Sequence, residues 1–412
     1  MNIVIPSLLG VEAIISKELQ EMGYDKDRIT VYDGQVYLEV DDTGEALSEA
    51  VANINLNLRT GERVQIEAGV FPAKTFDELY DGVRELDWEN WIPQGWAIHV
   101  RGYSRKSELF GIPACQRTIK KGIIERLLSR SGNSIGGVVP EDPDLGIMRI
   151  QFSILQDVVH FLVDTSGESL HKRGYRPVSN FAPLKETLAA AMLKIMLWEP
   201  FSDEALLDPF CGSGTIPIEA AMLAANVPPG LNRRFAAEQY PFLDTSAFER
   251  AREKGRDEMD TAAPDNPFIF ASDIDKDAIS LAVENATRVN VREFISFSRR
   301  DANRISGRDW LSSHPEFKRC LVIGNPPYGE RMGDEEEVSA IHKALGENFF
   351  TNGGLQFGVR LGIITSNNDF ESEIGVRADR RRKLYNGMIR CQFYQYYRHP
   401  RRPSAADNTR RL

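Results

Sequence analysis

The stretch ALLDPFCGSGTIPIEAAMLAA, residues 205–225, predicts a strand, a glycine loop and a helix in direct succession. Residues 205–207 are apolar, as in a short buried strand, and residues 215–225 continue as a helix with Pro217 in its first turn, where proline is tolerated. The glycines of the loop let a ligand approach the backbone, and the N-terminus of the following helix favours an anionic group. This unit predicts a parallel sheet with its ligand site at the carboxyl ends of the strands.

The alternation of strands and helices continues on both sides of this stretch. Residues 228–266 interrupt it and are interpreted as an insertion. The alternation is typical of an α/β Rossmann-like domain. Further strands are expected at 268–271, 295–297, 321–324, 361–365 and 388–397, and further helices at 187–198 and 277–289.

The first 165 residues follow a different order, which predicts small α+β domains and no doubly wound sheet. Their last two strands are expected to form an antiparallel pair. The pattern predicts strands at 2–5, within 30–40 on both sides of the Asp33-Gly34 turn, and at 97–101, 148–154 and 158–164, with helices at 11–22, 44–56, 76–86 and from 113 onward.

Composition places the chain among ordinary globular proteins. Its 412 residues are 42% hydrophobic and 27% charged, and the length predicts two or three domains. No apolar stretch is long enough for a membrane span, and the N-terminus has no basic leader, so we expect neither a signal peptide nor a membrane partner. The four cysteines are far apart and form no C-x-x-C pair, which favours reduced thiols in a cytoplasm, and the six histidines form no paired motif, so no metal is expected.

The net charge of −10 hides two basic tracts. Residues 101–130 carry 8 basic and 2 acidic side chains, and residues 376–412 carry 11 basic and 2 acidic side chains. Because screening limits each field to about 10 Å, such tracts can bind a polyanion on an acidic protein. Solvated surface is the equally weighted alternative.

Three acidic residues follow successive strands and suggest a nucleoside-containing ligand. Pro217 occupies the third glycine position of a dinucleotide loop, so Asp208 suits instead a cationic ligand with a carboxylate tail, such as S-adenosylmethionine. Asp273 can accept both ribose hydroxyls, although Asp273 or Asp275 can also cap the next helix. Asp301 can face an adenine amino group or lie on the surface.

Asn325-Pro326-Pro327-Tyr328 follows the apolar strand residues 320–323 and suits a flat ring that carries an amine. The side chain of Asn325 offers a carbonyl acceptor, and the carbonyls near the prolines need no local partner because proline has no N–H. The ring of Tyr328 can stack on a base. The predicted chemistry is transfer to an exocyclic amine of a nucleobase, and a plain Pro-Pro turn is the alternative.

The motifs D-P-F-C-G-S-G, A-S-D-I-D and N-P-P-Y-G-E-R-M, in that order, resemble class I S-adenosylmethionine-dependent methyltransferases that act on amines. Residues 170–176, 228–233 and 382–387 resemble THUMP-domain RNA guanine-N2-methyltransferases, above all the group that contains the N-terminal half of the bacterial 23S rRNA methyltransferase RlmL. The resemblance implies a ferredoxin-like region at 1–64, a THUMP RNA-binding domain at 65–165 with 45 as an alternative start, and a methyltransferase domain at 184–400. An abrupt shift in composition predicts a linker at 166–183, and a disordered tail is expected at 401–412.

The resemblance also implies roles for individual residues. Asn325 and the carbonyl of Pro326 would grip the target amine while Tyr328 stacks on the base. Cys211 departs from this pattern, because a thiol beside a methyl donor is better explained as a packing residue than as a nucleophile. The residues implied for the cofactor are Asp208, Cys211, Gly212 and Gly214 for methionine, Asp273 for ribose and Asp301 for adenine.

The expected reaction is methylation of guanosine N2 in RNA, with rRNA favoured over tRNA. A DNA adenine N6-methyltransferase and a non-catalytic RNA-binding assembly factor are the alternatives, and the oligomeric state is left open. The RNA would be held by basic side chains that position it without reading its sequence. These are Arg117, Lys120, Lys121, Lys172, Arg173, Arg380, Arg381 and Arg382.

Overall fold

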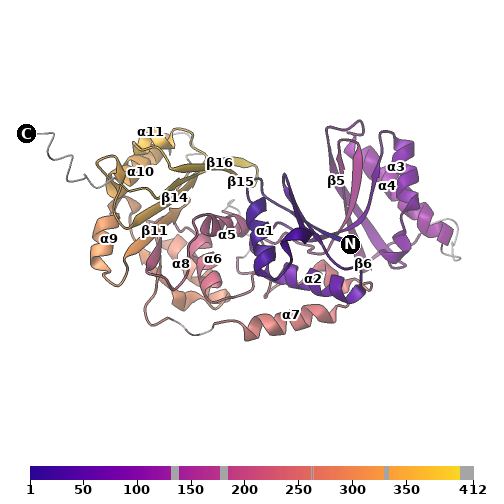
Figure 1. The fold of residues 1–412 in the computed structure, drawn as a ribbon, viewed down its shortest axis with the longest axis horizontal. Helices are drawn as coiled ribbons and strands as arrows, with labels where there is room; N and C mark the ends of the chain where they lie inside the picture. Colours follow the sequence, from indigo (N-terminus) through magenta and orange to yellow (C-terminus); the bar gives the residue numbers. More distant parts are fainter. Residues whose placement is uncertain (131–138, 177–183, 261, 263, 329–333, 400–412) are drawn as a thin grey trace, which may run out of the picture. The chain divides into compact units, whose positions relative to one another are not determined.

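A computed structural model describes residues 1–130, 139–176, 184–260, 262, 264–328 and 334–399 of the chain (Figure 1). Two compact units emerge from its contacts. The first comprises Met1–Ser7, Ile15–Leu170 and Pro229–Asp257, and the second comprises Leu8–Ile14, His171–Pro228 and Glu258–Leu412. The disordered tail expected at 401–412 lies outside the described residues.

The first unit is built on a sheet in the order β2-β3-β1-β4-β7-β6-β5. β1 pairs with both β3 and β4 in antiparallel fashion, so the expected ferredoxin-like and THUMP parts share one sheet. The strands are β1 (Asn2–Pro6), β2 (Ile29–Tyr32), β3 (Gln35–Glu39), β4 (Gln65–Pro72), β5 (Trp96–Arg105), β6 (Asp142–Leu155) and β7 (Val158–Asp164). The helices of this part of the chain are α1 (Glu12–Glu21), α2 (Gly44–Asn57), α3 (Phe76–Glu85) and α4 (Ile112–Arg130).

Local sequence signals explain most of these elements. Thr43 caps α2 through the N–H of Ala46, and Thr75 and Glu78 form a capping box that starts α3. The hairpin of β2 and β3 turns at Gly34, whose φ of 77° favours glycine. The expected antiparallel pairing of β6 with β7 is confirmed, whereas β5 runs parallel to β6 because α4 crosses between them.

Most of the insertion predicted at 228–266, namely Pro229–Asp257, belongs to the first unit. Gly230 donates its N–H to the carbonyl of Leu56 at 2.8 Å, and the hydroxyl of Tyr240 donates to the carbonyl of Asp164 at 2.8 Å. Helix α7 (Ser246–Asp257) packs on α2 (Figure 1). The chain therefore leaves the second unit, completes the first and returns.

The second unit is an α/β domain around the sheet β10-β9-β8-β11-β14-β16-β15. The first five of these strands are parallel, and β16 pairs antiparallel with both β14 and β15. The strands are β8 (Glu204–Asp208), β9 (Ile269–Asp273), β10 (Ile295–Arg299), β11 (Arg319–Gly324), β14 (Val359–Thr365), β15 (Arg380–Asn386) and β16 (Ile389–Tyr396). The helices are α5 (Glu186–Ile195), α6 (Thr215–Ala224), α8 (Lys276–Arg288), α9 (Gly307–Ser313), α10 (Asp334–Phe349) and α11 (Phe370–Ile374).

The predicted Rossmann-like fold is confirmed, with additions at one edge of the sheet. The arginine-rich run at 380–383 lies in β15, which pairs with β16 around Gly387. β8 and β11 are neighbours, and the chain runs from β8 outward to β10 before it returns to β11. This reversal of strand order opens a crevice at the carboxyl ends of β8 and β11, where ligands bind in open α/β sheets. Within the described part of the chain, no helix is both long and apolar enough to cross a membrane.

Candidate active site

A cleft of about 440 Å³ opens beside the carboxyl ends of β8, β9 and β11. Parallel strands end at the same edge of a sheet, which brings together side chains that are far apart in sequence. Six of the predicted site residues line the cleft. They are Asp208, Cys211, Gly212, Asp273, Asp301 and Asn325.

The two glycines of the loop have different surroundings. Gly212 has a φ of 50°, and a Cβ added to it would meet no atom within 4 Å, so it faces open space in the cleft. Its N–H donates to Oδ2 of Asp273 at 2.9 Å. Gly214, with a φ of 87°, is the N-cap of α6, and an added Cβ would lie 3.0 Å from the Cβ of Ala282 on α8. Gly214 thus permits close packing of two helices and is not among the described residues that line the cleft.

Asp208 is a buried carboxyl group that has few hydrogen-bond partners to offset the cost of its burial. It is 1% exposed, and its Oδ1 accepts the N–H of Phe210 at 3.0 Å. Burial raises its pKa to about 8, the N–H of Phe210 opposes this rise, and the nearby carboxylate of Asp273 adds to it. No cationic side chain among the described residues pairs with Asp208. A buried carboxylate of this kind is suited to a ligand that brings its own positive charge.

Asp273 and Asp301 also hold backbone N–H groups. Asp273 binds the N–H of Asp275 through Oδ1 at 3.0 Å, and Asp275 in turn caps α8. Asp301 accepts the N–H of Asn303 at 2.9 Å. The capping alternative is therefore correct for Asp275, while Asp273 and Asp301 combine a local bond with a place in the cleft.

Cys211 lines the cleft but is poorly suited to act as a nucleophile. Its side chain is buried, and burial raises its pKa, with Asp208 and Asp273 adding to the effect. The thiol therefore stays protonated, and a protonated thiol is a poor nucleophile.

The Asn325–Tyr328 segment begins directly after β11. Asn325 and Pro327 line the cleft, whereas Pro326 is buried and, like Tyr328, is not among the described lining residues. The hydroxyl of Tyr328 donates to Oδ1 of Asn325 at 2.5 Å, and the sulfur of Cys391 on β16 lies 3.6 Å from the same hydroxyl. The acceptor predicted to meet an amine is thus oriented by its own neighbour in the chain.

The sequence pattern did not identify part of the lining. Glu337, Ala340 and Ile341 reach the cleft from α10, a helix that was not predicted. Val338, Ile341 and Leu345 are spaced three and four residues apart, a helical signal that was available. Ser213 and Asn303 also line the cleft, but nothing in the sequence separates them from surrounding loop residues.

The structure corrects the prediction for Arg173. This residue is 2% exposed, and its guanidinium bonds to the carboxylate of Glu219 on α6 at 3.2 Å. Nearby, Arg176 pairs with Glu186 at 3.6 Å and bonds to the hydroxyl of Thr215. A buried and paired arginine cannot present its charge to RNA, so Arg173 anchors the segment before α5 to the first turns of α6.

The other predicted RNA-binding residues vary in how much charge they present. Arg117, Lys172 and Arg380 are exposed. Lys120 is 2.8 Å from Glu141 and Lys121 is 3.9 Å from Glu125. On β15, Arg381 pairs with Glu371 at 2.5 Å, and burial lowers the pKa of Arg382.

Comparisons with known families match three successive parts of the chain. The RlmL ferredoxin-like domain matches residues 2–65, the THUMP domain matches 73–164, and the RMKL-like methyltransferase domain matches 173–395. The last match alone covers more than half of the chain.

Individual relatives extend this likeness over nearly the whole chain. "Putative RNA methyltransferase YpsC" of Bacillus subtilis is 37% identical over 94% of this chain and 94% of its own length. "Ribosomal RNA large subunit methyltransferase K/L" of Methylococcus capsulatus is 31% identical over 94% of this chain, which spans only 50% of that protein. The crystal structure of SMU.472, a putative methyltransferase complexed with SAH, is 34% identical, covers 97% of this chain and 99% of its own, and has a TM-score of 0.82.

Proposed function

The chain belongs to the RMKL-like methyltransferase family, and on this premise we propose that it transfers a methyl group from S-adenosylmethionine to the exocyclic N2 amine of a guanosine in RNA, with 23S rRNA as the substrate. The observation that carries the proposal is the presence of Asn325 in the same cleft as Asp208 and Asp273. This cleft places an amine acceptor beside carboxylates suited to a cationic nucleoside. The guanine N2 position comes from the resemblance to the guanine-N2 enzymes.

The described residues fit S-adenosylmethionine. Asp208 is buried without a cationic partner, and Gly212 leaves its side of the cleft open. Asp208, Cys211 and Gly212 would hold the methionine part, Asp273 the ribose and Asp301 the adenine, with Gly214 supporting the loop from behind. The cofactor, when bound, supplies an electrophilic methyl group on a sulfonium.

The residues after β11 would orient the target amine. A carbonyl oxygen has two lone pairs, so Oδ1 of Asn325 can accept the hydroxyl of Tyr328 and one N–H of the amine together. The carbonyl of Pro326 would accept the second N–H. Two acceptors held in this way favour a tetrahedral nitrogen whose lone pair is available for attack, so that orientation and electrostatics supply most of the catalysis. The ring of Tyr328 is proposed to stack on the base, which must first leave any duplex.

RNA is favoured over DNA by the N-terminal half of the chain. The THUMP match at 73–164 lies in the first unit, and the two relatives named above are described as a putative RNA methyltransferase and a ribosomal RNA large subunit methyltransferase. Because the chain spans about half of the K/L relative, the activity of that whole protein is not transferred to it.

The direct test is to incubate the purified chain with labelled S-adenosylmethionine and three substrates: in vitro transcribed 23S rRNA, transcribed tRNA and duplex DNA. Digestion to nucleosides and mass spectrometry should detect N2-methylguanosine in the rRNA. Label in tRNA alone would show that tRNA, and not 23S rRNA, is the substrate. N6-methyladenine in DNA would show that the enzyme is a DNA adenine methyltransferase. Cofactor binding without methyl transfer to any of the three would favour the assembly-factor alternative.

A further inference from the structure

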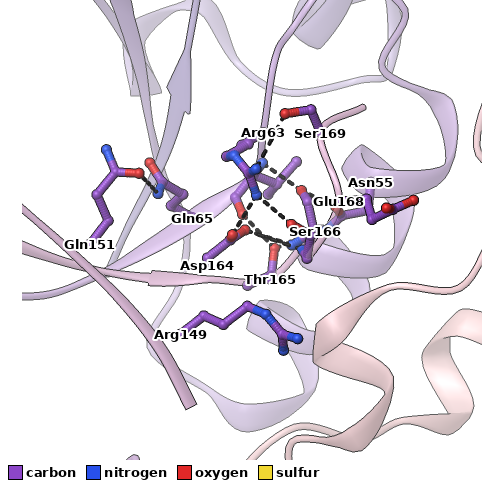
Figure 2. A network of polar contacts seen from close by, with 12 residues as sticks. Asn55, Arg63, Gln65, Arg149, Gln151, Asp164, Thr165, Ser166, Glu168 and Ser169 are labelled. Atoms are coloured by element: carbon purple, nitrogen blue, oxygen red, sulfur yellow. Dashed lines mark hydrogen bonds and ion pairs between the residues drawn. The ribbon is translucent and has the colours of Figure 1, made fainter. Parts of the chain in front are cut away.

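A second cavity, of about 390 Å³, lies within the first unit and shares no residue with the candidate active site. It is bounded by β5, β6 and the segments that flank β4 and β7. Figure 2 shows part of its polar lining. The polar and charged residues that line it are Arg63, His99, Arg101, Arg149, Gln151 and Asp164.

The register of the sheet explains why these side chains meet. His99 pairs with Arg149 across the parallel strands β5 and β6, and Arg101 pairs with Gln151. Neighbouring strands are about 4.8 Å apart, and residues i and i+2 on one strand are separated by about 6.7 Å. The four side chains therefore form a compact group on one face of the sheet. Two alternate residues, which point to the other face, are buried in the core: Ile98 and Met148.

The carboxylate in this cavity is already engaged. Oδ2 of Asp164 accepts a hydrogen bond of 2.5 Å from Arg63, and its Oδ1 accepts the N–H groups of Ser166 at 3.0 Å and Gly167 at 3.3 Å (Figure 2). Burial also raises the pKa of this carboxyl group, against the opposing effect of Arg63. Asp164 therefore adds little negative charge to the cavity.

Two arginines of the cavity lack a direct ion pair. Within the described ranges, neither Arg101 nor Arg149 has a carboxylate within ion-pair distance. The side chain of Arg149 donates a hydrogen bond of 3.4 Å to the carbonyl of Ile147, and it also interacts with the hydroxyl of Tyr240 and, more weakly than Arg63 does, with the charge of Asp164. Gln151 accepts a hydrogen bond from Gln65 through its carbonyl at 3.1 Å, which leaves its amide N–H groups for the cavity (Figure 2).

We propose that this cavity binds a phosphate group of the RNA backbone, with Arg101 and Arg149 as the charged contacts and Gln151 as a neutral donor. The inference rests on the proposed function, since it assigns a binding site for the same RNA in the unit that carries the THUMP match. Guanidinium groups and amide N–H groups are donors that match the acceptor oxygens of a phosphodiester. The carboxylate of Asp164 does not oppose this binding strongly, because Arg63 pairs with it.

An adjoining cavity favours RNA over a free anion. This second space, also about 390 Å³, shares Ile147 and Arg149 with the first and is lined by Trp96, whose ring packs on Gly146, and by Asp144. RNA-binding proteins commonly pair cations for the backbone with an aromatic ring on which a base stacks. A free phosphate would gain nothing from Trp96, whereas a nucleotide bound at Arg149 can place its base there.

The test measures how the full chain binds a short, fluorescein-labelled single-stranded oligoribonucleotide at several salt concentrations. Each phosphate contact on a single strand contributes about 0.7 to the salt slope, so Arg101→Gln/Arg149→Gln, which removes the contacts to one phosphate, should flatten it by about 0.7 and weaken binding at least about tenfold at low salt. Arg101→Lys/Arg149→Lys keeps the charges and should retain most of the slope. Arg28→Gln, which removes an exposed arginine of the same unit, is the matched control and should behave as the unmodified chain.

Two results would overturn the inference. One is a glutamine double variant that keeps both the affinity and the slope of the unmodified chain. The other is inorganic phosphate that displaces the labelled strand as well as unlabelled RNA does at equal phosphate concentration, which would make the cavity a free-anion site. Binding is scored without turnover, so a failure of the proposed methylation leaves this measurement readable, and a failure here leaves methylation to be judged by its own product.

Discussion

The hydroxyl of Tyr328 donates a 2.5 Å hydrogen bond to Oδ1 of Asn325, three residues earlier in the chain. The bond orients the amide of Asn325, which lines the cleft, and Oδ1 has a second lone pair that can accept another hydrogen bond. Tyr328 is thus proposed to have two roles, one through its ring and one through its hydroxyl. The two roles can be separated by substitution.

Tyr328→Phe keeps the ring and removes the hydroxyl. We expect kcat to fall about tenfold, because the amide of Asn325 loses its orienting partner, whereas base stacking and cofactor affinity are retained. Steady-state kinetics with varied RNA and calorimetry with S-adenosylhomocysteine would measure the two effects. A normal kcat would show that the hydrogen bond has no part in catalysis, and Tyr328→Leu then tests the ring alone.

Asn325→Ala removes the proposed acceptor itself. We expect methyl transfer to fall about 100-fold to 1000-fold, the usual cost of losing one preorganised polar contact in an active site, with cofactor affinity nearly unchanged. Asn325→Asp keeps an acceptor oxygen in the same position and should retain more activity than the alanine variant. Equal and normal turnover in both variants would contradict the role of this side chain.

Asp208→Asn separates stability from ligand binding. The carboxyl group has a folded-state pKa of about 8, above its ordinary value, so between about pH 4 and pH 8 the folded protein holds a proton that the unfolded chain releases. The free energy of unfolding is therefore highest in acid, and ionisation of Asp208 lowers it as the pH rises to about 8. The amide variant lacks this decline and should be more stable at pH 8, by as much as a few kcal/mol, with little difference near pH 4.

The same variant should bind S-adenosylmethionine about tenfold or more weakly, because the cationic ligand loses its buried counter-charge. Thermal unfolding across pH and calorimetry at pH 8 would give both quantities. A variant that is less stable at pH 8 than the unmodified chain would show that the carboxylate is compensated in a way that the described residues do not reveal.

Gly212→Ala and Gly214→Ala form a matched pair. Both glycines have positive φ, which costs an L-residue about 1–2 kcal/mol. A methyl group at Gly212 would extend into open cleft space and should mainly weaken cofactor binding, whereas one at Gly214 would crowd Ala282 and should mainly lower the free energy of unfolding. Urea titrations and calorimetry distinguish the two, and identical profiles for both variants would contradict the assignment.

Arg173→Met tests the buried ion pair. Removing the guanidinium leaves the carboxylate of Glu219 buried and unpaired, so we expect a loss of about 3–5 kcal/mol in the free energy of unfolding. Arg173→Met/Glu219→Met should recover much of that loss, because no unpaired charge remains. If the single variant keeps its stability but loses RNA affinity, Arg173 contacts RNA after all.

Much of the second unit could be predicted because its signals are local. The strand, loop and helix of residues 205–225 are contiguous, and Asp208, Asp273 and Asn325 each follow a short apolar strand. Topology then places the ends of those strands at one edge of the sheet, so their convergence in one cleft follows from the alternation of strands and helices.

The missed features depend on contacts between distant residues. The sequence did not predict β15, because residues 380–383 are all charged. Edge strands commonly carry charge, so they show only a weak alternation of buried and exposed residues. Arg173 was interpreted as a surface cation because its partner, Glu219, lies far along the chain on a helix that reads as apolar. The basic cavity at Arg101 and Arg149 depends on a parallel register between β5 and β6 that no local pattern specifies.

The return of Pro229–Asp257 to the first unit limits how this protein can be divided. A cut in the segment 166–183 would leave the N-terminal fragment without α7 and expose the side of α2 that α7 covers. The C-terminal fragment would keep α7 as a segment without its partner. A chimaera with a single junction therefore cannot join the N-terminal half of this protein to the C-terminal half of another. Any such hybrid must take residues 229–257 from the same protein as the N-terminal half on which they pack.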